Sequence, residues 1–354
     1  MTTLPESPGD ESGEGVPASP FGAVALAAYQ PDEPLFARQL RSIQAQTHKE
    51  FVCLISVDGD HQRVADMVRR ACGDDSRFQV LGYEDRLGFH HNFERALKAV
   101  PAEAKWVALS DQDDYWYPEK LATLLPRLGQ AALVTGQARV VPPQVSAAGG
   151  DSSSGTLTDR RIVGPADLLA NNQVTGSLCV FRRDVLDLAL PFPSMAAPSQ
   201  YHDHWIGLCS LVLGGMHIEN LVLQDYIQHG GNVVGESRQS LPTSVRNTLR
   251  FVQRYEGSTS PRSISSIIHK TGLGWRTLMA RTLLERAEKS RLPVGQELRQ
   301  ALNLYARPSR WQLVRSLVGG VRRGNVSPVR ALEISLGIIL PNFPPGGREA
   351  EHRS

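Results

Sequence analysis

The sequence has few cysteines and no long apolar run, and both absences exclude classes of protein. Its 354 residues include four cysteines, which stand far apart and form no Cys-x-x-Cys pair. This argues against a zinc site and against a disulfide framework. No stretch supplies the roughly 18 consecutive apolar residues of a membrane-spanning helix. The N-terminal segment lacks the basic and apolar regions of a signal peptide, so we expect a cytoplasmic protein.

The phosphate-binding motifs of two enzyme classes are absent as well. No Gly-x-Gly-x-x-Gly follows the first apolar run, which argues against a dinucleotide-dependent dehydrogenase. No Gly-x-x-x-x-Gly-Lys-Ser/Thr loop is present either, which argues against a nucleoside triphosphatase.

The charge is unevenly distributed along the chain. Residues 241–354 carry 19 − 7 = +12, so the net charge of +2 leaves 2 − 12 = −10 for residues 1–240. A basic tail can bind phosphate, and an anionic lipid surface is one source of it. Solvated Arg-rich helices explain the same charge without a partner. Few aromatic residues lie between the arginines, so we expect no nucleic-acid partner.

Apolar runs alternate with helix-like periodicity over the first 110 residues, with short connections. Strands are predicted at 21–28, 51–57, 78–83 and 106–110, with helices between them. The runs are apolar without alternation, which is typical of strands buried on both faces. The pattern predicts an α/β fold with an open, mostly parallel central sheet flanked by helices.

The pattern loosens beyond Val141, where a loop is expected at 142–159. Further on, we expect a helix at 165–170, a strand at 177–181, a helix at 204–213, and strands at 216–219 and 221–227. Amphipathic helices follow, including 245–255, 276–287 and 311–318. The predicted organisation is a disordered leader (1–20), a sheet domain (21–236) and a basic helical C-terminal region (237–354).

Polar residues follow the predicted strands where these end. Tyr29 follows the first strand, Asp58 the second and Asp111 the fourth. Open α/β sheets bind ligands outside the carboxyl ends of their strands. We therefore expect a ligand site at this edge.

An acidic cluster, Asp111-Gln112-Asp113-Asp114, stands at the end of the fourth strand. Three neighbouring carboxylates repel one another unless a cation or a proton balances them. Oxygen ligands suit Mg²⁺ or Mn²⁺, and Asp111 and Asp113 point the same way in an extended stretch. For Asp114 the alternative is the N-cap of a helix that starts near Pro118.

Four segments in order, VALAAYQ, ISVDG, LGFHHNFERAL and ALSDQDDYWYPEKL, resemble the family 2 glycosyltransferases, and within them the rhamnosyltransferase-like branch. The resemblance covers roughly residues 23–235. It implies a GT-A fold that binds a nucleotide-diphosphate sugar together with one metal ion.

The resemblance also implies roles at the donor site. Asp113 takes the metal, and Asp111 binds the metal or the ribose. Asp58 meets the base or ribose, with Val57 where the family usually has a second Asp; a turn residue before Gly59 is the alternative. The remaining donor-binding residues implied are Ala27, Ala28, Tyr29, Gly88, Asn92, Gln112, His229 and Asn232. The last two lie in an HGGNVVG segment, for which a plain turn is the alternative.

Asp203, in the segment QYHDHW, matches the acidic residue that acts as general base in this family. Inversion needs a carboxylate that takes the proton of the attacking hydroxyl. The alternative is an N-cap of the following helix. Trp116, Thr175, Gly176 and His202 are the implied acceptor wall. A structural role fits Gly176 equally well, and an exposed position without a role also fits His202.

The predicted function is therefore metal-dependent, inverting transfer of a sugar to a cell-surface glycan or lipid-linked acceptor. dTDP-rhamnose is the favoured donor, and a UDP-hexose is the alternative donor. The alternative to a transferase is a non-catalytic scaffold that binds nucleotide-sugars. Contact with the inner face of the membrane is an option. The acceptor, the linkage and the oligomeric state stay open.

Overall fold

The computed structural model describes residues 20–82, 85–142, 155–197, 200–227, 249–250 and 252–340. The predicted leader, apart from Pro20, lies outside the described residues. So do His229 and Asn232 of the HGGNVVG segment.

The first four long strands form a parallel half-sheet. β1 (Gly22–Ala28) lies between β2 (Phe51–Val57) and β4 (Trp106–Ser110), and β2 pairs with β3 (Phe78–Leu81). β2 and β4 have the predicted bounds, β1 starts one residue later than predicted, and β3 ends two residues earlier.

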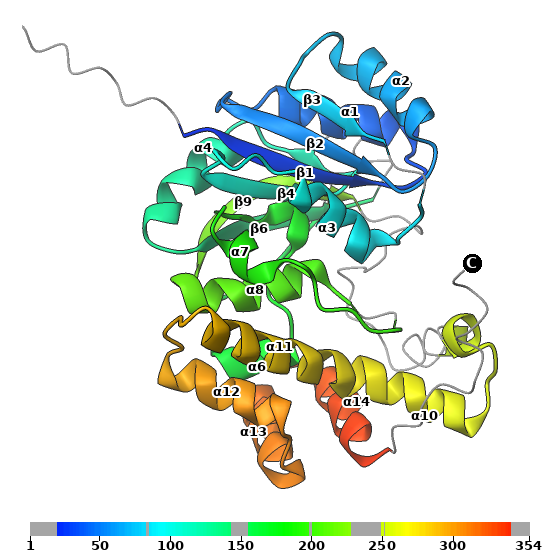
Figure 1. The fold of residues 1–354 in the computed structure, drawn as a ribbon, viewed down its shortest axis with the longest axis vertical. Helices are drawn as coiled ribbons and strands as arrows, with labels where there is room; N and C mark the ends of the chain where they lie inside the picture. Colours follow the sequence, from blue (N-terminus) through cyan, green and yellow to red (C-terminus); the bar gives the residue numbers. More distant parts are fainter. Residues whose placement is uncertain are drawn as a thin grey trace, which may run out of the picture.

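Both faces of β1 are buried, which explains its continuous apolar run. Ala23 and Ala25 belong to a core cluster with residues of α3 (Phe89–Lys98). Val24 and Leu26 belong to a second cluster, with residues of α1 (Glu33–Gln44) and α2 (His61–Cys72). Successive strand side chains point to opposite faces, so helices cover the sheet on both sides (Figure 1).

The second half of the sheet is mixed. β4 pairs antiparallel with β8 (Val180–Arg182), and β8 pairs antiparallel with β6 (Leu133–Val141). β6 runs parallel to β9 (Met216–Ile227), whose far side pairs with β5 (Tyr115–Trp116); β7 (Thr156–Leu157) pairs with β6. The order is β3-β2-β1-β4-β8-β6-β9-β5. The predicted α/β fold with a central sheet is confirmed.

In this half, one predicted strand starts later than expected, two predicted strands are joined into one, and one strand was missed. The segment predicted as a strand at 177–181 starts as a 3-10 helix, η2 (Gly176–Leu178), and β8 begins only at Val180. The two strands predicted at 216–219 and 221–227 are one strand, because β-bulge irregularities opposite residues 135–138 keep β9 paired with β6 across Asn220. β6 was missed because Gly136 and Gln137 interrupt its apolar pattern.

The helices predicted at 165–170, 204–213, 276–287 and 311–318 are confirmed. The helices described along the rest of the chain include α4 (Lys120–Leu124), η1 (Leu125–Gly129), α6 (Pro165–Ala170), α7 (Val185–Ala189), α8 (His202–Leu213), α10 (Pro261–His269), the π-helical η3 (Lys270–Gly274), α11 (Trp275–Lys289), α12 (Gln296–Ala306), α13 (Arg310–Arg322) and α14 (Pro328–Ile339). α8 begins two residues before its predicted start.

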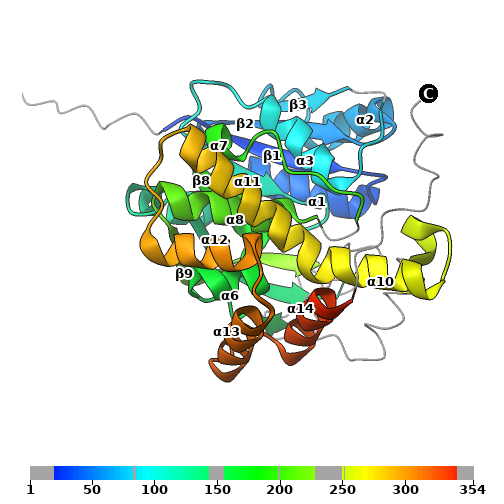
Figure 2. The same cartoon turned by 60° about the horizontal axis from the view of Figure 1, so that its bottom comes forward.

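The C-terminal helices share the core of the sheet. One cluster of buried side chains joins Ala25 of β1 and Phe93 of α3 to Met279, Leu302 and Ile334 of α11, α12 and α14. Figures 1 and 2 show α11 against α8, with α12, α13 and α14 beyond it. Across the described part of the chain, no helix is both long enough and apolar enough to span a membrane.

Candidate active site

The ends of β1, β2 and β4 are joined by hydrogen bonds. The Asp58 N–H donates to the Ala28 carbonyl oxygen at 2.8 Å. The Gln112 side chain accepts from the Tyr29 N–H (2.7 Å) and donates to the Tyr29 carbonyl (3.1 Å). The Tyr29 ring is exposed, and the Arg86 guanidinium lies 4.3 Å from its centroid. An exposed aromatic ring thus stands beside the acidic cluster.

The other residues predicted at the donor are less accessible. Asp58 is 2 % exposed; its carboxylate accepts from the N–H groups of Leu87 (2.6 Å) and Gly88 (2.8 Å). Gly88 has a φ of 79°, a conformation that favours glycine, and precedes α3.

Asn92 is buried and fastens α3 to both strand ends. Its Nδ2 donates to the Ala28 carbonyl (3.2 Å), and its Oδ1 accepts from the Ser56 hydroxyl (2.7 Å) and from Arg95 Nη2 (3.0 Å). Ala28 is fully buried, whereas Ala27 is partly buried. Asn92 and Ala28 therefore support this edge of the sheet from within.

Within the acidic cluster, Asp114 differs from its neighbours. It is fully buried, and its carboxylate accepts from the Ile227 N–H (3.2 Å) and from Gln224 Nε2 (3.2 Å). The N-cap position of α4 belongs to Glu119, so the N-cap interpretation of Asp114 was wrong. Burial raises the pKa of Asp114 to about 7, and the charge of Asp113 contributes in the same direction.

Asp111 and Asp113 are only partly buried. Burial raises the pKa of Asp111 well above its usual value, and the negative charges of Asp114, Asp113 and Asp203 raise it further. The described residues contain no group of three His, Cys, Asp or Glu side chains that could hold a metal. Mg²⁺ is usually bound through one or two carboxylates plus substrate phosphates. Two crowded, partly accessible carboxylates fit that chemistry.

A buried lysine beneath the cluster was not singled out from the sequence. Lys120 is fully buried, and its ammonium donates to the Ser177 carbonyl and to Gln224 Oε1 (2.8 Å). Gln224 Nε2 in turn donates to Asp114, so a neutral amide connects the two buried charges. In the sequence, Lys120 is a charged residue a few positions after an acidic cluster. Nothing in that pattern indicates that its side chain is buried.

The Asp203 carboxylate lies in the first turn of α8, at the same site. Oδ1 accepts from the His204 N–H (2.7 Å) and from Asn172 Nδ2 (3.1 Å), and Oδ2 accepts from the Gly176 N–H (3.2 Å). The N-cap of α8 is Tyr201, so Asp203 is not the cap. Burial raises the pKa of Asp203 to about 6, although these donors and the Arg160 charge lower it.

Two predicted acceptor residues are buried. The expectation of an exposed His202 was wrong: its ring stacks on Phe93 with centroids 3.9 Å apart, and it is 7 % exposed. Burial lowers the pKa of His202 well below its usual value. Trp116 is fully buried in a core cluster, with Lys120 Nζ 3.5 Å from its ring centroid. Trp116 therefore has a packing role, because it offers no surface to an acceptor.

Thr175 and Gly176 lie directly beside Asp203. A Cβ atom built on Gly176 would come within 2.9 Å of His202 Nε2 and 3.5 Å of Asp203 Cβ, so only glycine fits between these two side chains. Gly176 therefore has a structural reason for being glycine in addition to its predicted place at the acceptor.

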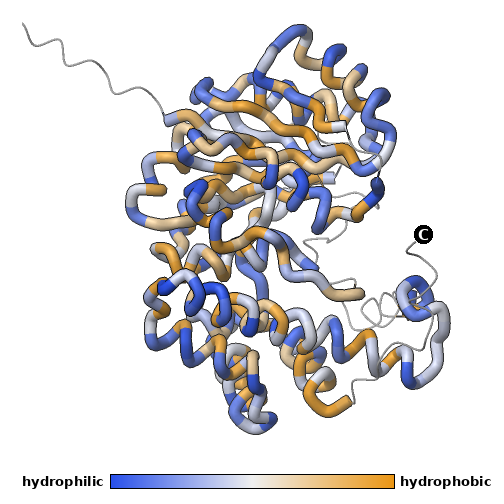
Figure 3. The backbone as a smooth tube through the Cα atoms, viewed as in Figure 1, coloured by the Kyte–Doolittle hydropathy of each residue, from blue (hydrophilic) through white to orange (hydrophobic). Residues whose placement is uncertain are grey.

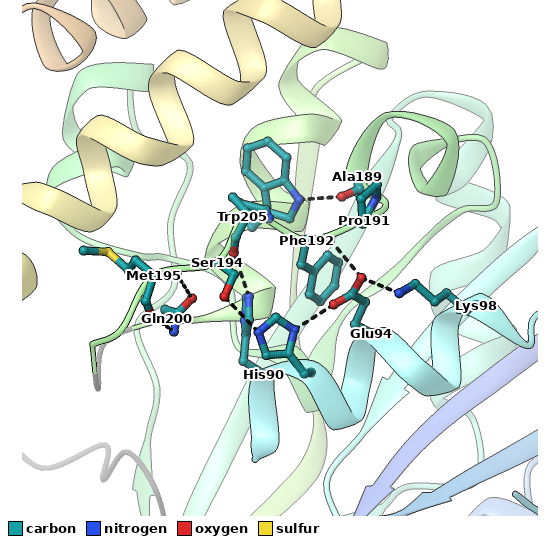
Figure 4. A network of polar contacts seen from close by, with 12 residues as sticks. His90, Glu94, Lys98, Ala189, Pro191, Phe192, Ser194, Met195, Gln200 and Trp205 are labelled. Atoms are coloured by element: carbon teal, nitrogen blue, oxygen red, sulfur yellow. Dashed lines mark hydrogen bonds and ion pairs between the residues drawn. The ribbon is translucent and has the colours of Figure 1, made fainter. Parts of the chain in front are cut away.

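The loop that leads to α8 is held by α3, as Figure 4 shows. Glu94 accepts from Lys98 Nζ (2.7 Å) and from the Phe192 N–H (3.2 Å), and it pairs with His91 Nδ1 (2.7 Å). Gln200 bonds to the N–H of Met195 (2.8 Å) further along this loop. The GFHHNFER segment thus anchors the chain that precedes the carboxylate of Asp203.

Comparison with known proteins adds the family. Residues 24–188, from β1 into α7, match the model of glycosyl transferase family 2. No curated protein matches the chain.

Many solved structures are similar to this chain, among them two that contain a bound nucleotide-sugar. TarS 1–349 of S. aureus, in complex with UDP-GlcNAc, is 14 % identical with a TM-score of 0.47, over 90 % of this chain and 88 % of that one. The mannosyltransferase PcManGT of Pyrobaculum calidifontis, in complex with GDP-Man and Mn²⁺, is 16 % identical with a TM-score of 0.46, over 90 % and 86 %. With the motifs and the α/β sheet in agreement, residues 24–188 of this chain are a glycosyl transferase family 2 segment.

Proposed function

We propose that this protein is an inverting glycosyltransferase with a nucleotide-diphosphate sugar as donor. The acceptor is a hydroxyl of a cell-surface glycan or of a lipid-linked glycan. One observation carries the proposal: η2 connects Asp203 to β4, because the Gly176 N–H donates to Asp203 Oδ2 (3.2 Å) and the Cys179 carbonyl, which ends η2, accepts from the Leu109 N–H of β4 (3.4 Å). Asp111 follows directly at the end of β4, and the charge of Asp203 is among those that raise its pKa. The base and the acidic cluster therefore belong to one electrostatic site.

Asp203 is the proposed general base. With a pKa of about 6 it is ionised at neutral pH and still basic enough to accept a proton. It takes the proton of the acceptor hydroxyl while that oxygen bonds to the anomeric carbon. The bond from this carbon to the diphosphate oxygen breaks, and the nucleoside diphosphate leaves with the electron pair.

Asp111 and Asp113 are the proposed ligands of Mg²⁺ or Mn²⁺. A bound divalent ion supplies positive charge for the diphosphate leaving group. Tyr29, exposed beside Gln112, is the proposed contact of the nucleotide. Buried Asp58 holds the loop at Gly88, and buried Asn92 holds the end of β1 at Ala28, so both shape this site.

Rhamnose from dTDP-rhamnose is the proposed sugar, on the resemblance of the DQDDYWYPEKL segment, and a UDP-hexose is the competing donor. Residues 21–236 form the proposed catalytic domain and residues 237–354 the helical region. The proposed setting is the cytoplasm.

Calorimetry tests the proposal. Titration of dTDP-rhamnose and UDP-sugars, with and without Mn²⁺, should show metal-dependent binding of one donor. Asp113→Ala should weaken it strongly, while Asp74→Ala, at an exposed acidic position on the surface, should not. If no nucleotide-sugar binds under any metal condition, the proposal fails. If a donor binds but is neither transferred nor hydrolysed, the chain is a scaffold.

A further inference from the structure

The fold exposes one tryptophan far from the site. Trp311, in the first turn of α13, is 85 % exposed, whereas Trp106, Trp116, Trp205 and Trp275 are at most 1 % exposed. These five are all the tryptophans of the chain. A single exposed apolar side chain needs no explanation, but a group of them marks an interaction surface.

Trp311 is one of several exposed apolar side chains on two helices that contact each other. Val318 lies two turns after it on α13, and the neighbouring helix α14 exposes Leu332, Leu336 and Ile339 at the spacing of one helical face. The inner faces of both helices are already occupied, because Leu313, Leu317, Ile334 and Ile338 are buried in the core. The outer faces are therefore not needed for folding.

The same surface is basic. Residues 310–339 contain five arginines and one acidic residue, a net charge of 5 − 1 = +4. Two of these arginines have partners, since Arg323 pairs with Asp167 and Arg330 with Glu333. Arg310, Arg315 and Arg322 are exposed and have no ion pair within the described residues. Arg315 and Arg322 share the Trp311 face of α13 by their spacing.

We propose that the outer faces of α13 and α14 form a docking surface for a bilayer with anionic headgroups. In this arrangement the exposed apolar and aromatic side chains of both helices enter the interfacial layer of the bilayer. The arginine side chains contact lipid phosphates. Figure 1 places this surface at the opposite end of the molecule from α2 and β3, and Figure 3 shows α14 in largely hydrophobic colours. The inference is independent of the transfer reaction.

Other occupants fit this surface less well. A nucleic acid would use the arginines but leave Leu332, Leu336 and Ile339 in water. A second copy would bring like-charged arginines together, which disfavours association. The chain's own residues 341–354 are mostly polar, Pro and Gly, and offer little apolar surface in return.

Trp311 is a built-in reporter for the test. The full-length protein is mixed with phosphatidylcholine vesicles, or with vesicles that also contain phosphatidylglycerol, at low and at high salt. Sedimentation and tryptophan emission are then recorded. We expect binding to the anionic vesicles that weakens with salt, a blue shift of the emission, and quenching by brominated lipid. Trp311→Phe should remove the shift and the quenching.

Variants separate the two parts of the surface. Arg315→Gln with Arg322→Gln should weaken binding to anionic vesicles roughly tenfold or more. Leu332→Ser with Leu336→Ser should weaken binding to the same vesicles by a similar factor. The matched controls, Arg63→Gln with Arg69→Gln on α2 and Leu221→Ser on β9, change exposed positions elsewhere and should bind as wild type.

Three results would overturn the proposal: no sedimentation with any vesicle, equal losses in the surface and control variants, or self-association without lipid that Leu332→Ser with Leu336→Ser abolishes. The last result would assign the surface to a second copy of the chain.

Discussion

The Gly176 N–H donates a hydrogen bond of 3.2 Å to Oδ2 of Asp203, which ties the start of η2 to the first turn of α8. Asn172 and the N–H of His204 hold the other carboxylate oxygen. Three donors would by themselves lower the pKa of a carboxylate. Burial outweighs them here and raises the pKa of Asp203 to about 6. The carboxylate is thus held in one orientation and ionises close to neutral pH.

The first prediction concerns pH. A general base must be deprotonated, so activity should be present above a pH of about 6 and fall about tenfold per pH unit below it. The measurement is kcat/KM for donor turnover between mildly acidic and mildly alkaline pH. A flat profile through this range would contradict the assignment.

Asp203→Asn provides the companion measurement. Loss of the base should cost about 10²- to 10⁴-fold in kcat. Because the folded protein disfavours the charged form of Asp203, the neutral amide should leave Tm at alkaline pH unchanged or higher. A variant that instead loses activity because it unfolds would point to a purely structural role.

The second prediction concerns Gly176. An alanine here would place its Cβ 2.9 Å from His202 Nε2, closer than normal contacts allow. His202 has little freedom to retreat, because it is buried and stacked on Phe93. Gly176→Ala should therefore displace the backbone beside Asp203 and lower kcat, with a loss of stability of about 1–3 kcal/mol.

Gly129→Ala is the matched control, because a Cβ at Gly129 meets nothing within 4 Å. It should retain wild-type activity and stability. Equal behaviour of the two variants in thermal unfolding and donor turnover would show that the contact with His202 does not matter.

Much of the fold could be predicted from the sequence, because its parallel strands are buried on both faces and read as uninterrupted apolar runs. β2 and β4 are examples. β6 was missed because a strand beside a bulge tolerates Gly136 and Gln137, which break such a run. At the site, the motif indicated which residue types gather at the strand ends. It could not indicate that Trp116 and His202 face the core, because burial depends on contacts with elements distant in sequence.

The third prediction concerns Glu94. Burial opposes its ionisation, but hydrogen bonds from His91, Lys98 and the Phe192 N–H together lower the pKa of Glu94 to about 2. A depressed folded pKa stabilises the protein above the unfolded value, and this contribution is lost as pH falls toward 2. Glu94→Gln should therefore cost about 2 kcal/mol at neutral pH, and the difference from wild type should shrink in acid.

Urea unfolding at several pH values measures this difference. Glu103→Gln, at an exposed position, should match wild type throughout. A deficit of Glu94→Gln that stays constant down to acidic pH would mean that the lost interaction is not electrostatic.

The fourth prediction concerns Lys120 and Asp114. Both are fully buried, and Gln224 bonds to both. Burial lowers the pKa of Lys120 and raises the pKa of Asp114, while the attraction between the two charges opposes both shifts. Removing one partner leaves the other as an uncompensated buried charge, so Lys120→Met should cost about 3–5 kcal/mol.

The double variant Lys120→Met with Asp114→Asn decides whether this loss is electrostatic. Without either charge, no uncompensated ion remains, so the double variant should be more stable than the sum of the single losses implies, by about 1 kcal/mol or more. Lys105→Met, at an exposed lysine, should change the free energy of unfolding by no more than about 0.5 kcal/mol. If the stability losses of the two single variants simply add, Lys120 stabilises the site through its contacts with Trp116 and Ser177. The stability of the acidic cluster then does not depend on the charge of Lys120.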